Sequence, residues 1–266
     1  MLDKSTVRKQ VWEELRKVAR PDSCFHWDFG EFIPDYEGSE QCAQAIRQLE
    51  SYQRSSIVFI TPDNNLLALR QHAISDGKTI LITSYGIVRG FMRLDREDVP
   101  QGQERYAASL DGMEEYAKPV SIEDLSHLDK IDLLVTGASI INLQGVRWGK
   151  GHGYFDLEWA MLRELGMVDE ATPIAAVVHD CQVIDLELAP EPYDTIVDHI
   201  VTPTWIIDIH RILPKPQSIL WKKLDPAMVE NTVTPRIASQ KDRSLRLASG
   251  QKSMLLSRVP TMGGAI

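Results

Sequence analysis

The residues best suited to chemistry lie together between positions 145 and 156, where glycines are interleaved with basic and aromatic side chains. The glycines are Gly145, Gly149, Gly151 and Gly153. Glycine permits positive φ angles, so successive N–H groups can turn inward around an anion that lies close to the main chain. Arg147 can donate two hydrogen bonds to phosphate oxygens, and Lys150 adds a positive charge. Together with the N-terminus of a helix expected from residue 155, this pattern favours a phosphate-binding loop.

Three further side chains of this segment could take part. Asp156 offers a hard carboxylate oxygen to Mg²⁺, which keeps several waters and bridges to phosphates. Contact with a phosphate and exposure to solvent are equally expected for His152, and Tyr154 is expected to pack against a ligand or to cap the loop. The segment lacks the Lys-Ser or Lys-Thr of a P-loop and the GxGxxG spacing of a dinucleotide site. A glycine-rich surface loop without a ligand is the alternative interpretation.

Short apolar runs, separated by helical stretches, predict a parallel sheet that is covered on both faces. The apolar runs are 57–60, 79–83, 131–135, 174–178 and 196–201. The expected helices are 4–19, about 40–53, 65–75 and 155–165. Residues 95–128 are polar and rich in turn residues, which suggests an excursion over one face of the sheet. The predicted fold class is α/β, with an open, mostly parallel sheet and helices on both faces.

One α/β domain is predicted over residues 1–225, followed by a C-terminal tail over 226–266. The tail is polar, locally basic and aperiodic, and partial disorder is expected there. A chain of 266 residues can bury a core without disulfide bonds. Cys24, Cys42 and Cys181 form no CxxC pair, so neither a disulfide framework nor a zinc cluster is expected.

The net charge of −9 argues against a nucleic-acid partner, whereas a phosphorylated small molecule needs only local positive charge. The first residues contain no apolar core of a secretory signal, and no segment approaches the roughly 20 apolar residues that span a bilayer. We therefore expect a cytoplasmic protein with a small-molecule substrate and no membrane partner. The sequence does not indicate the oligomeric state.

The segment 145–156 resembles the signature Gly-x-Arg-x-Gly-x-Gly-x-Gly-Tyr-x-Asp of the 5-formyltetrahydrofolate cyclo-ligase family, also called methenyltetrahydrofolate synthetases. Lys4 and Arg8, four residues apart on the first helix, match a Lys and an Arg that hold nucleotide phosphates in that family. Farther along, Gln182, Asp194 and Asp198 match a Gln and an Asp-x-x-x-Asp pattern, whose second aspartate is a metal-side carboxylate. The similarity covers about residues 4–225.

The resemblance is closer to the branch of methenyltetrahydrofolate synthetase domain-containing proteins, on the segments 149–161 and 179–185 and on Pro203. Residues 61–66 depart from the pattern of the cyclo-ligases, in which a Glu and a Thr face the pterin. Asp63 can replace the Glu with a side chain one methylene shorter, and Leu66 stands where the hydroxyl would be. The nucleotide half of the site is therefore the better matched half.

The resemblance implies a three-layer αβα fold like that of NagB, RpiA and the CoA transferases, and an ATP- and Mg²⁺-dependent ligase. In the implied reaction, 5-formyltetrahydrofolate is cyclised to 5,10-methenyltetrahydrofolate while ATP becomes ADP and phosphate. Arg147 and Tyr154 would be the catalytic residues, and Asp156 with Asp198 would hold Mg²⁺. The substrate would contact Asp63, Tyr154 and Gln182. The nucleotide would contact Lys4, Arg8, Gly145, Arg147, Gly149, Lys150, Gly151, His152 and Gly153.

Two other functions agree with the same residues. The first is a non-catalytic or regulatory member of the family that retains nucleotide binding. The second is an ATP-dependent enzyme acting on another heterocycle, such as a thiamin-related compound. The altered stretch 61–66 separates these from the folate enzyme. A Cys–His nucleophile formed by His179 and Cys181 is geometrically conceivable, because alternate residues of a strand share a face, but inert packing is the favoured role for Cys181.

Overall fold

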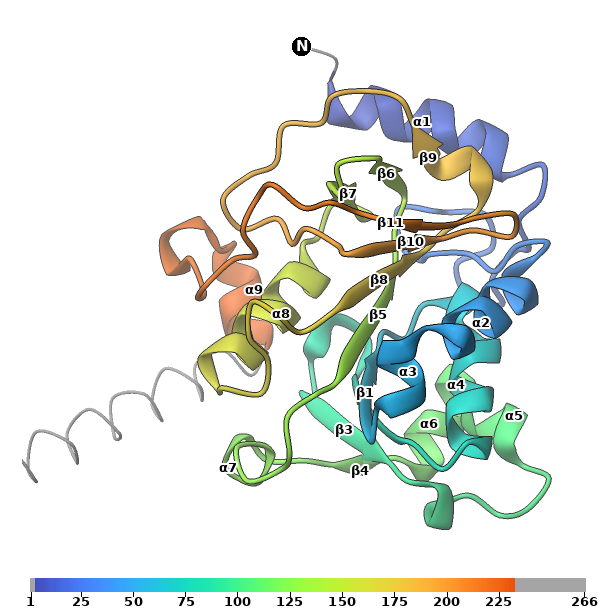
Figure 1. Cartoon of the computed structure of the whole chain (residues 1–266), viewed down its shortest axis with the longest axis vertical. Helices are drawn as coiled ribbons and strands as arrows, with labels where there is room; N and C mark the ends of the chain where they lie inside the picture. Colours follow the sequence, from blue (N-terminus) through green and yellow to red (C-terminus); the bar gives the residue numbers. More distant parts are fainter. Residues whose placement is uncertain (1–2, 233–266) are drawn as a thin grey trace, which may run out of the picture.

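An eight-stranded sheet forms the centre of the molecule in the computed structural model, which describes residues 3–232 (Figure 1). The strand order is β11-β10-β8-β5-β1-β2-β3-β4. Parallel pairing joins the central strands β10 (His199–Val201), β8 (Ile174–Val177), β5 (Leu133–Gly137), β1 (Ile57–Ile60) and β2 (Thr79–Thr83). Antiparallel pairing adds β11 (Ile206–Asp208) at one edge, and β3 (Phe91–Leu94) followed by β4 (Lys118–Pro119) at the other. The predicted mostly parallel sheet is confirmed.

Helices cover both faces of this sheet, so the α/β class is confirmed (Figure 1). One face packs against α2 (Ser39–Gln48), α3 (Glu50–Arg54), α4 (Leu67–Ser75), α5 (Glu104–Ala107) and α6 (Leu110–Tyr116). The other packs against α7 (Ile122–Leu125), α8 (Tyr154–Glu164) and α9 (Pro226–Asn231). Strand β1 shows the division, because Val58 and Ile60 join the first core while Ile57 and Phe59 join the second.

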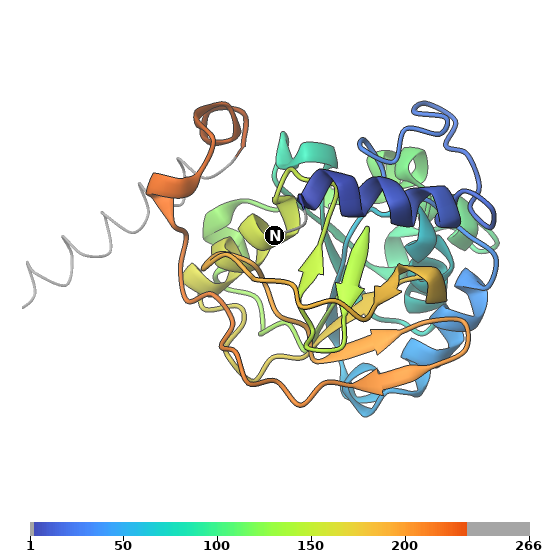
Figure 2. The ribbon, with the colours of Figure 1, turned by 90° about the horizontal axis from the view of Figure 1, so that it is seen from above.

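A second, three-stranded sheet lies beyond the carboxyl ends of the central strands and carries the first helix (Figure 2). Its order is β7-β6-β9, from β6 (Ile140–Asn142), β7 (Arg147–Trp148) and β9 (Val183–Ile184). Helix α1 (Lys4–Leu15) buries Val7 and Val11 against this sheet in a separate small core. The short 3-10 turns are η1 (Asn64–Leu66), η2 (Tyr85–Ile87), η3 (Arg96–Asp98), η4 (Asp180–Gln182) and η5 (Trp221–Lys223).

Element boundaries differ from the sequence predictions at identifiable residues. The helix expected over 4–19 ends at Leu15, and the one expected over 40–53 is split at Leu49, whose backbone is extended. The stretch 95–128 contributes β4 and short helices. Residues 226–231 of the predicted tail form α9, and Met228 packs against the main core. The remainder of that tail, residues 233–266, lies outside the described residues.

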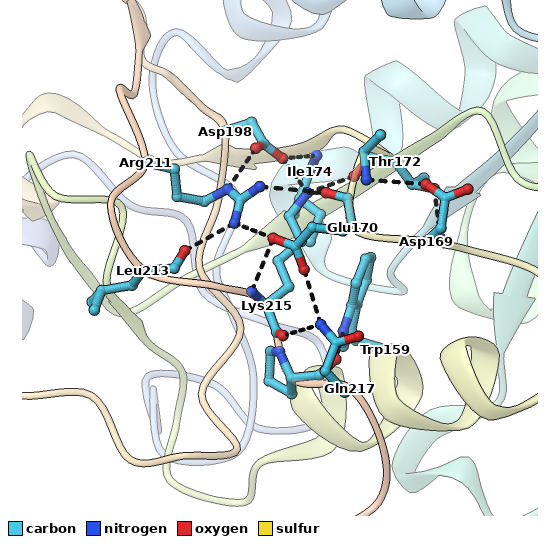
Figure 3. A network of polar contacts seen from close by, with 12 residues as sticks. Trp159, Asp169, Glu170, Thr172, Ile174, Asp198, Arg211, Leu213, Lys215 and Gln217 are labelled. Atoms are coloured by element: carbon cyan, nitrogen blue, oxygen red, sulfur yellow. Dashed lines mark hydrogen bonds and ion pairs between the residues drawn. The ribbon is translucent and has the colours of Figure 1, made fainter.

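A network of ion pairs fastens residues 211–217 to the start of β8 and β10 (Figure 3). The Asp198 carboxylate accepts hydrogen bonds from the Ile174 N–H at 2.8 Å, from Arg211 Nε at 2.9 Å and from Lys215 Nζ at 2.6 Å. The Lys215 side chain is fully buried, and its ammonium group also donates to the Thr172 carbonyl at 2.6 Å. Asp198 therefore acts as the counter-ion of a buried lysine.

We expect Asp198→Ala to lower the free energy of unfolding by about 3 kcal/mol, because it leaves the ammonium of Lys215 buried without its carboxylate. Urea unfolding of the full chain measures the change. Asp129→Ala, which removes an exposed carboxylate elsewhere, is the matched control and should change stability by less than about 0.5 kcal/mol. Equal stability of the two variants would contradict this role.

Candidate functional site

A cavity of about 290 Å³ opens where the parallel strands end at their carboxyl edge. Residues following β1 and β2 and the last residues of β5 line one side of it: Thr61, Asp63, Thr83, Ser84, Thr136 and Gly137. Ligands of open α/β sheets bind at this edge, where the strand order reverses. The chain leaves β1 toward β2 on one side, whereas β5 pairs on the other, so the cavity lies at such a reversal.

Four basic side chains from distant parts of the sequence line the opposite side of the cavity. They are Lys4, Arg8, Arg147 and Lys150. Arg8 Nε donates a hydrogen bond to the Gly149 carbonyl at 2.8 Å, which ties α1 to the glycine-rich loop. The cations of Lys4 and Arg8 lie 5.1 and 5.8 Å from the ring centre of Trp148. The structure therefore brings the two helix residues to the loop, while their contact with phosphate stays a prediction.

The glycines of the loop differ in what they do. Gly149, Gly151 and Gly153 line the cavity, and φ angles of 125° at Gly151 and 73° at Gly153 lie in the region that favours glycine. Gly153 is the N-cap of α8 and supplies no side-chain cap, so N–H groups of the first turn are left available. Gly145 does not line the cavity. A Cβ there would lie 2.7 Å from the Val197 carbonyl, so this glycine permits a close backbone packing instead.

Arg147 is buried, with 4% of its surface exposed, and is only partly paired. Its guanidinium donates to Asp156 Oδ1 at 3.0 Å and lies 4.4 Å above the ring of Phe155, but its Nε has no partner among the described residues. A buried guanidinium nitrogen without a partner is unusual, and phosphate oxygens would satisfy it. Together with the glycines, this group fits a polyphosphate.

Two carboxylates could serve a divalent cation beside that anion. Asp156 and Asp194 both line the cavity, whereas Asp198, the predicted metal ligand, does not. Burial, and then the nearby negative charge of Asp156, raise the pKa of Asp194. Within residues 3–232 there is no cluster of three or more potential metal ligands. A pair of carboxylates nevertheless fits Mg²⁺, which takes its other ligands from phosphates and water.

The prediction that Asp198 joins Asp156 at a metal is not supported by the geometry. Its carboxylate is used by Arg211 and Lys215, at the amino ends of β8 and β10. Of the two aspartates in the Asp-x-x-x-Asp pattern, Asp198 belongs to an ion-pair network outside the cavity, which the spacing of the sequence does not reveal. The pocket residue of that pattern is Asp194.

Gln182 is also outside the cavity. Its amide donates to the carbonyls of Ala138 at 2.6 Å and Ser139 at 3.2 Å, and its oxygen accepts the His179 N–H at 2.7 Å. This side chain positions the turn after β5 and does not face a substrate. The neighbouring Cys181 Sγ lies 3.3 Å from His179 Nδ1, but burial raises the pKa of the Cys181 thiol to about 11. A thiolate nucleophile is therefore unfavourable at this position.

The remaining predicted contacts lie in or around the cavity. Asp63 Oδ2 accepts the Thr61 hydroxyl at 2.5 Å and the Gly137 N–H at 2.9 Å. His152 stacks on Tyr154 with ring centres 5.5 Å apart. Tyr154 lines both this cavity and a second, more apolar one of about 590 Å³. That second cavity is lined by Leu157, Ala160, Ile219, Leu220, Leu224 and Met228, among others.

The sequence analysis assigned no role to Glu158, which the structure places in the cavity wall with 3% of its surface exposed. The Thr83 hydroxyl donates to its carboxyl group, and burial raises the pKa of Glu158 to about 8. The sequence contained a pattern that could have identified this residue. Glu158 interrupts the otherwise apolar run of Leu157, Trp159 and Ala160 on a helix whose buried face it shares.

The fold and the site define an α/β protein with a glycine-rich, cation-lined pocket at the carboxyl edge of its parallel sheet. The sequence profile of the 5-formyltetrahydrofolate cyclo-ligase family matches residues 1–203. The chain belongs to this family. The resemblance stated from the signature residues is confirmed.

Curated relatives point to the same branch. The human methenyltetrahydrofolate synthase domain-containing protein is 32% identical over 234 residues, which cover 86% of this chain and 59% of the relative. The zebrafish protein of that name (Danio rerio) is 32% identical over 225 residues, covering 82% and 56%. The chain thus spans about three fifths of the length of these relatives. The solved 5,10-methenyltetrahydrofolate synthetase of Aquifex aeolicus is 17% identical, covers 78% of this chain and 93% of its own, and superposes with a TM-score of 0.48.

Within residues 3–232, every helix is too short or too polar to cross a bilayer.

We expect Glu158→Gln to make the chain more stable than the wild type at pH 8, by roughly 2 to 4 kcal/mol. The unfolded carboxyl ionises near its ordinary pKa of 4.5, whereas the folded one ionises near about 8. The wild type therefore loses stability as the pH rises through this window, and the uncharged amide does not. Urea unfolding at several pH values measures the difference, which should vanish below about pH 4. A constant difference across the window would refute the assigned pKa.

Proposed function

We propose that this chain is an ATP- and Mg²⁺-dependent cyclo-ligase that converts 5-formyltetrahydrofolate to 5,10-methenyltetrahydrofolate. The observation that carries the proposal is the junction of α1 with the glycine-rich loop, where Lys4, Arg8, Arg147 and Lys150 line one cavity. Four cations around glycine N–H groups suit a nucleoside triphosphate. Family membership makes a reduced folate the first candidate for the second substrate.

The residues around the cavity would have different roles in such a reaction. Arg147 and the N–H groups from Gly149 to Gly153 would bind the phosphates, and Lys4 and Arg8 would balance their charge. Asp156 and Asp194 would hold Mg²⁺, which supplies charge neutralisation at the phosphates when bound.

In the proposed reaction the formyl oxygen of the substrate attacks the γ-phosphorus and ADP leaves. The exocyclic N10 amine then attacks the formyl carbon, and loss of the N10 proton and of phosphate leaves the methenyl bridge between N5 and N10. The protein has little covalent chemistry to perform in phosphoryl transfer, since positioning and electrostatic stabilisation account for most of the catalysis. Tyr154, which lines both cavities, would contact both substrates and hold the formyl oxygen of the folate near the γ-phosphate of the nucleotide.

One observation favours a second candidate, a nucleotide-binding member of the family that lacks the folate reaction. Leu66, which stands where the family has a hydroxyl group, is fully buried in the main core. The folate side of the pocket is therefore built from different groups. An ATP-dependent enzyme for another heterocycle agrees with the same observation.

Measuring ADP release with and without 5-formyltetrahydrofolate separates these functions. We expect release to rise at least about tenfold with the folate, because binding of both substrates assembles the reacting groups. Formation of 5,10-methenyltetrahydrofolate, followed by its absorbance, should match the ADP formed mole for mole. Tight ATP binding without folate-stimulated turnover would support the regulatory protein and contradict the ligase.

We expect Arg147→Ala to weaken MgATP binding by about 30-fold or more, because a buried guanidinium that donates to phosphate is lost. Arg8→Ala should weaken it by a smaller factor and does not disturb a buried ion pair. The matched control is Lys9→Ala, which removes an exposed cation from the same helix. Calorimetric titration measures the affinities, and thermal unfolding verifies that each variant is folded. Unchanged affinity in both arginine variants would refute the phosphate site.

A further inference from the structure

Glu158 is a buried acid in the wall of the cavity. It lies in the second turn of α8, and its carboxyl group contacts the Thr83 hydroxyl at the end of β2. The group belongs to the cavity wall that also contains Asp63 and the strand-end hydroxyls. Only 3% of the residue is exposed, so the carboxyl group has almost no contact with bulk solvent.

The hydrogen-bonding capacity of this carboxyl group is mostly unused. Protonated or ionised, it offers about four hydrogen-bonding sites, counting any O–H donor, and the Thr83 hydroxyl occupies one. Among residues 3–232, no other hydrogen bond and no ion pair to Glu158 is formed. The nearby cations are engaged elsewhere, since Arg147 pairs with Asp156 and the Lys150 ammonium lies 5.3 Å from the ring centre of Tyr85.

A buried acid with one partner destabilises a fold, and a leucine would fill the same space without that cost. Its neighbours on α8, Leu157 and Trp159, pack into the apolar core in this way. A ligand in the cavity can supply the missing hydrogen bonds. The second oxygen of Glu158 is thus open to a polar partner in the cavity.

We propose that Glu158 binds the hydrogen-bonding edge of the second substrate's heterocycle, a cyclic amide or aminopyrimidine, and selects that substrate. This inference rests on the proposed function and deepens it. A carboxyl group can form two hydrogen bonds side by side with the adjacent nitrogen atoms of such a ring. A pocket built in this way rejects a ligand that lacks those atoms, because the acid then stays buried without partners.

Asp63 is the second acid of this wall, but one of its oxygens is already used. Its Oδ2 accepts from both Thr61 and Gly137, which fixes the carboxylate at the end of β5. Glu158 carries the larger unused capacity. Thr83 orients it, so Thr83 is a positioning residue and Glu158 the binding residue.

The test compares the affinities of the two substrates separately. Calorimetric titration of the full chain with 5-formyltetrahydrofolate, and in parallel with MgATP, covers wild type, Glu158→Leu and Glu158→Gln. We expect Glu158→Leu to weaken folate binding by about 30-fold and Glu158→Gln by less, since the amide keeps one acceptor oxygen. The affinity for MgATP should stay within about twofold in both. Glu164→Gln, the same change on the same helix outside the cavity, is the control and should bind both ligands normally.

Each outcome has a distinct meaning when ADP release is measured on the same samples. Selective loss of folate affinity in Glu158→Leu supports the inference, whether or not the wild type turns over. Wild-type folate affinity in that variant, or an equal loss of MgATP affinity, overturns it even if the wild type is a working ligase. If folate binding needs Glu158 but never stimulates ADP release, the inference about Glu158 is supported and only the proposed ligase activity is contradicted. A wild type that binds no 5-formyltetrahydrofolate overturns both.

Discussion

The docking of α1 on the small β7-β6-β9 sheet is the contact on which the rest of the site depends. Val7 and Val11 bury the helix in its own core, and the Arg8 guanidinium then reaches the Gly149 carbonyl across 141 residues of sequence. Without this contact the glycine-rich loop would have only Arg147 and Lys150 to balance an anion. In a chain with a net charge of −9, the four cations that line this cavity give the local positive charge that the proposed polyphosphate substrate needs.

The lining of the cavity combines cations from α1 and the glycine-rich loop with hydroxyl and carboxyl groups from the strand ends and from α8. In the proposed reaction the cations would hold the phosphates, and Glu158 would contact the polar ring. Such a lining suits two substrates better than a single anion, because each substrate has binding groups of its own.

The fold, and the place of the glycine-rich loop in a cavity wall, could be predicted from the sequence because both depend on local patterns. Continuous apolar runs mark the buried parallel strands, and alternating glycines mark backbone that can approach a ligand closely. The antiparallel strands β3, β4 and β11 and the small sheet were not predicted, since they are short and their pairing is decided by distant partners. For the same reason spacing could not separate Asp194, in the cavity, from Asp198, held by Lys215.

The number of hydrogen-bond donors around a buried acid distinguishes Asp198, which has a structural role, from Glu158, which is proposed to bind a ligand. Asp198 and Glu158 are both largely removed from solvent, yet the first has three donors around it and the second has one. A carboxylate that is fully paired inside the protein has no capacity left for a substrate, whereas an incompletely paired one gains most when a substrate arrives. Counting donors around each buried acid therefore assigns function where residue type and sequence spacing do not. By that criterion the substrate side of this site is centred on Glu158, a residue that the phosphate-binding signature does not contain.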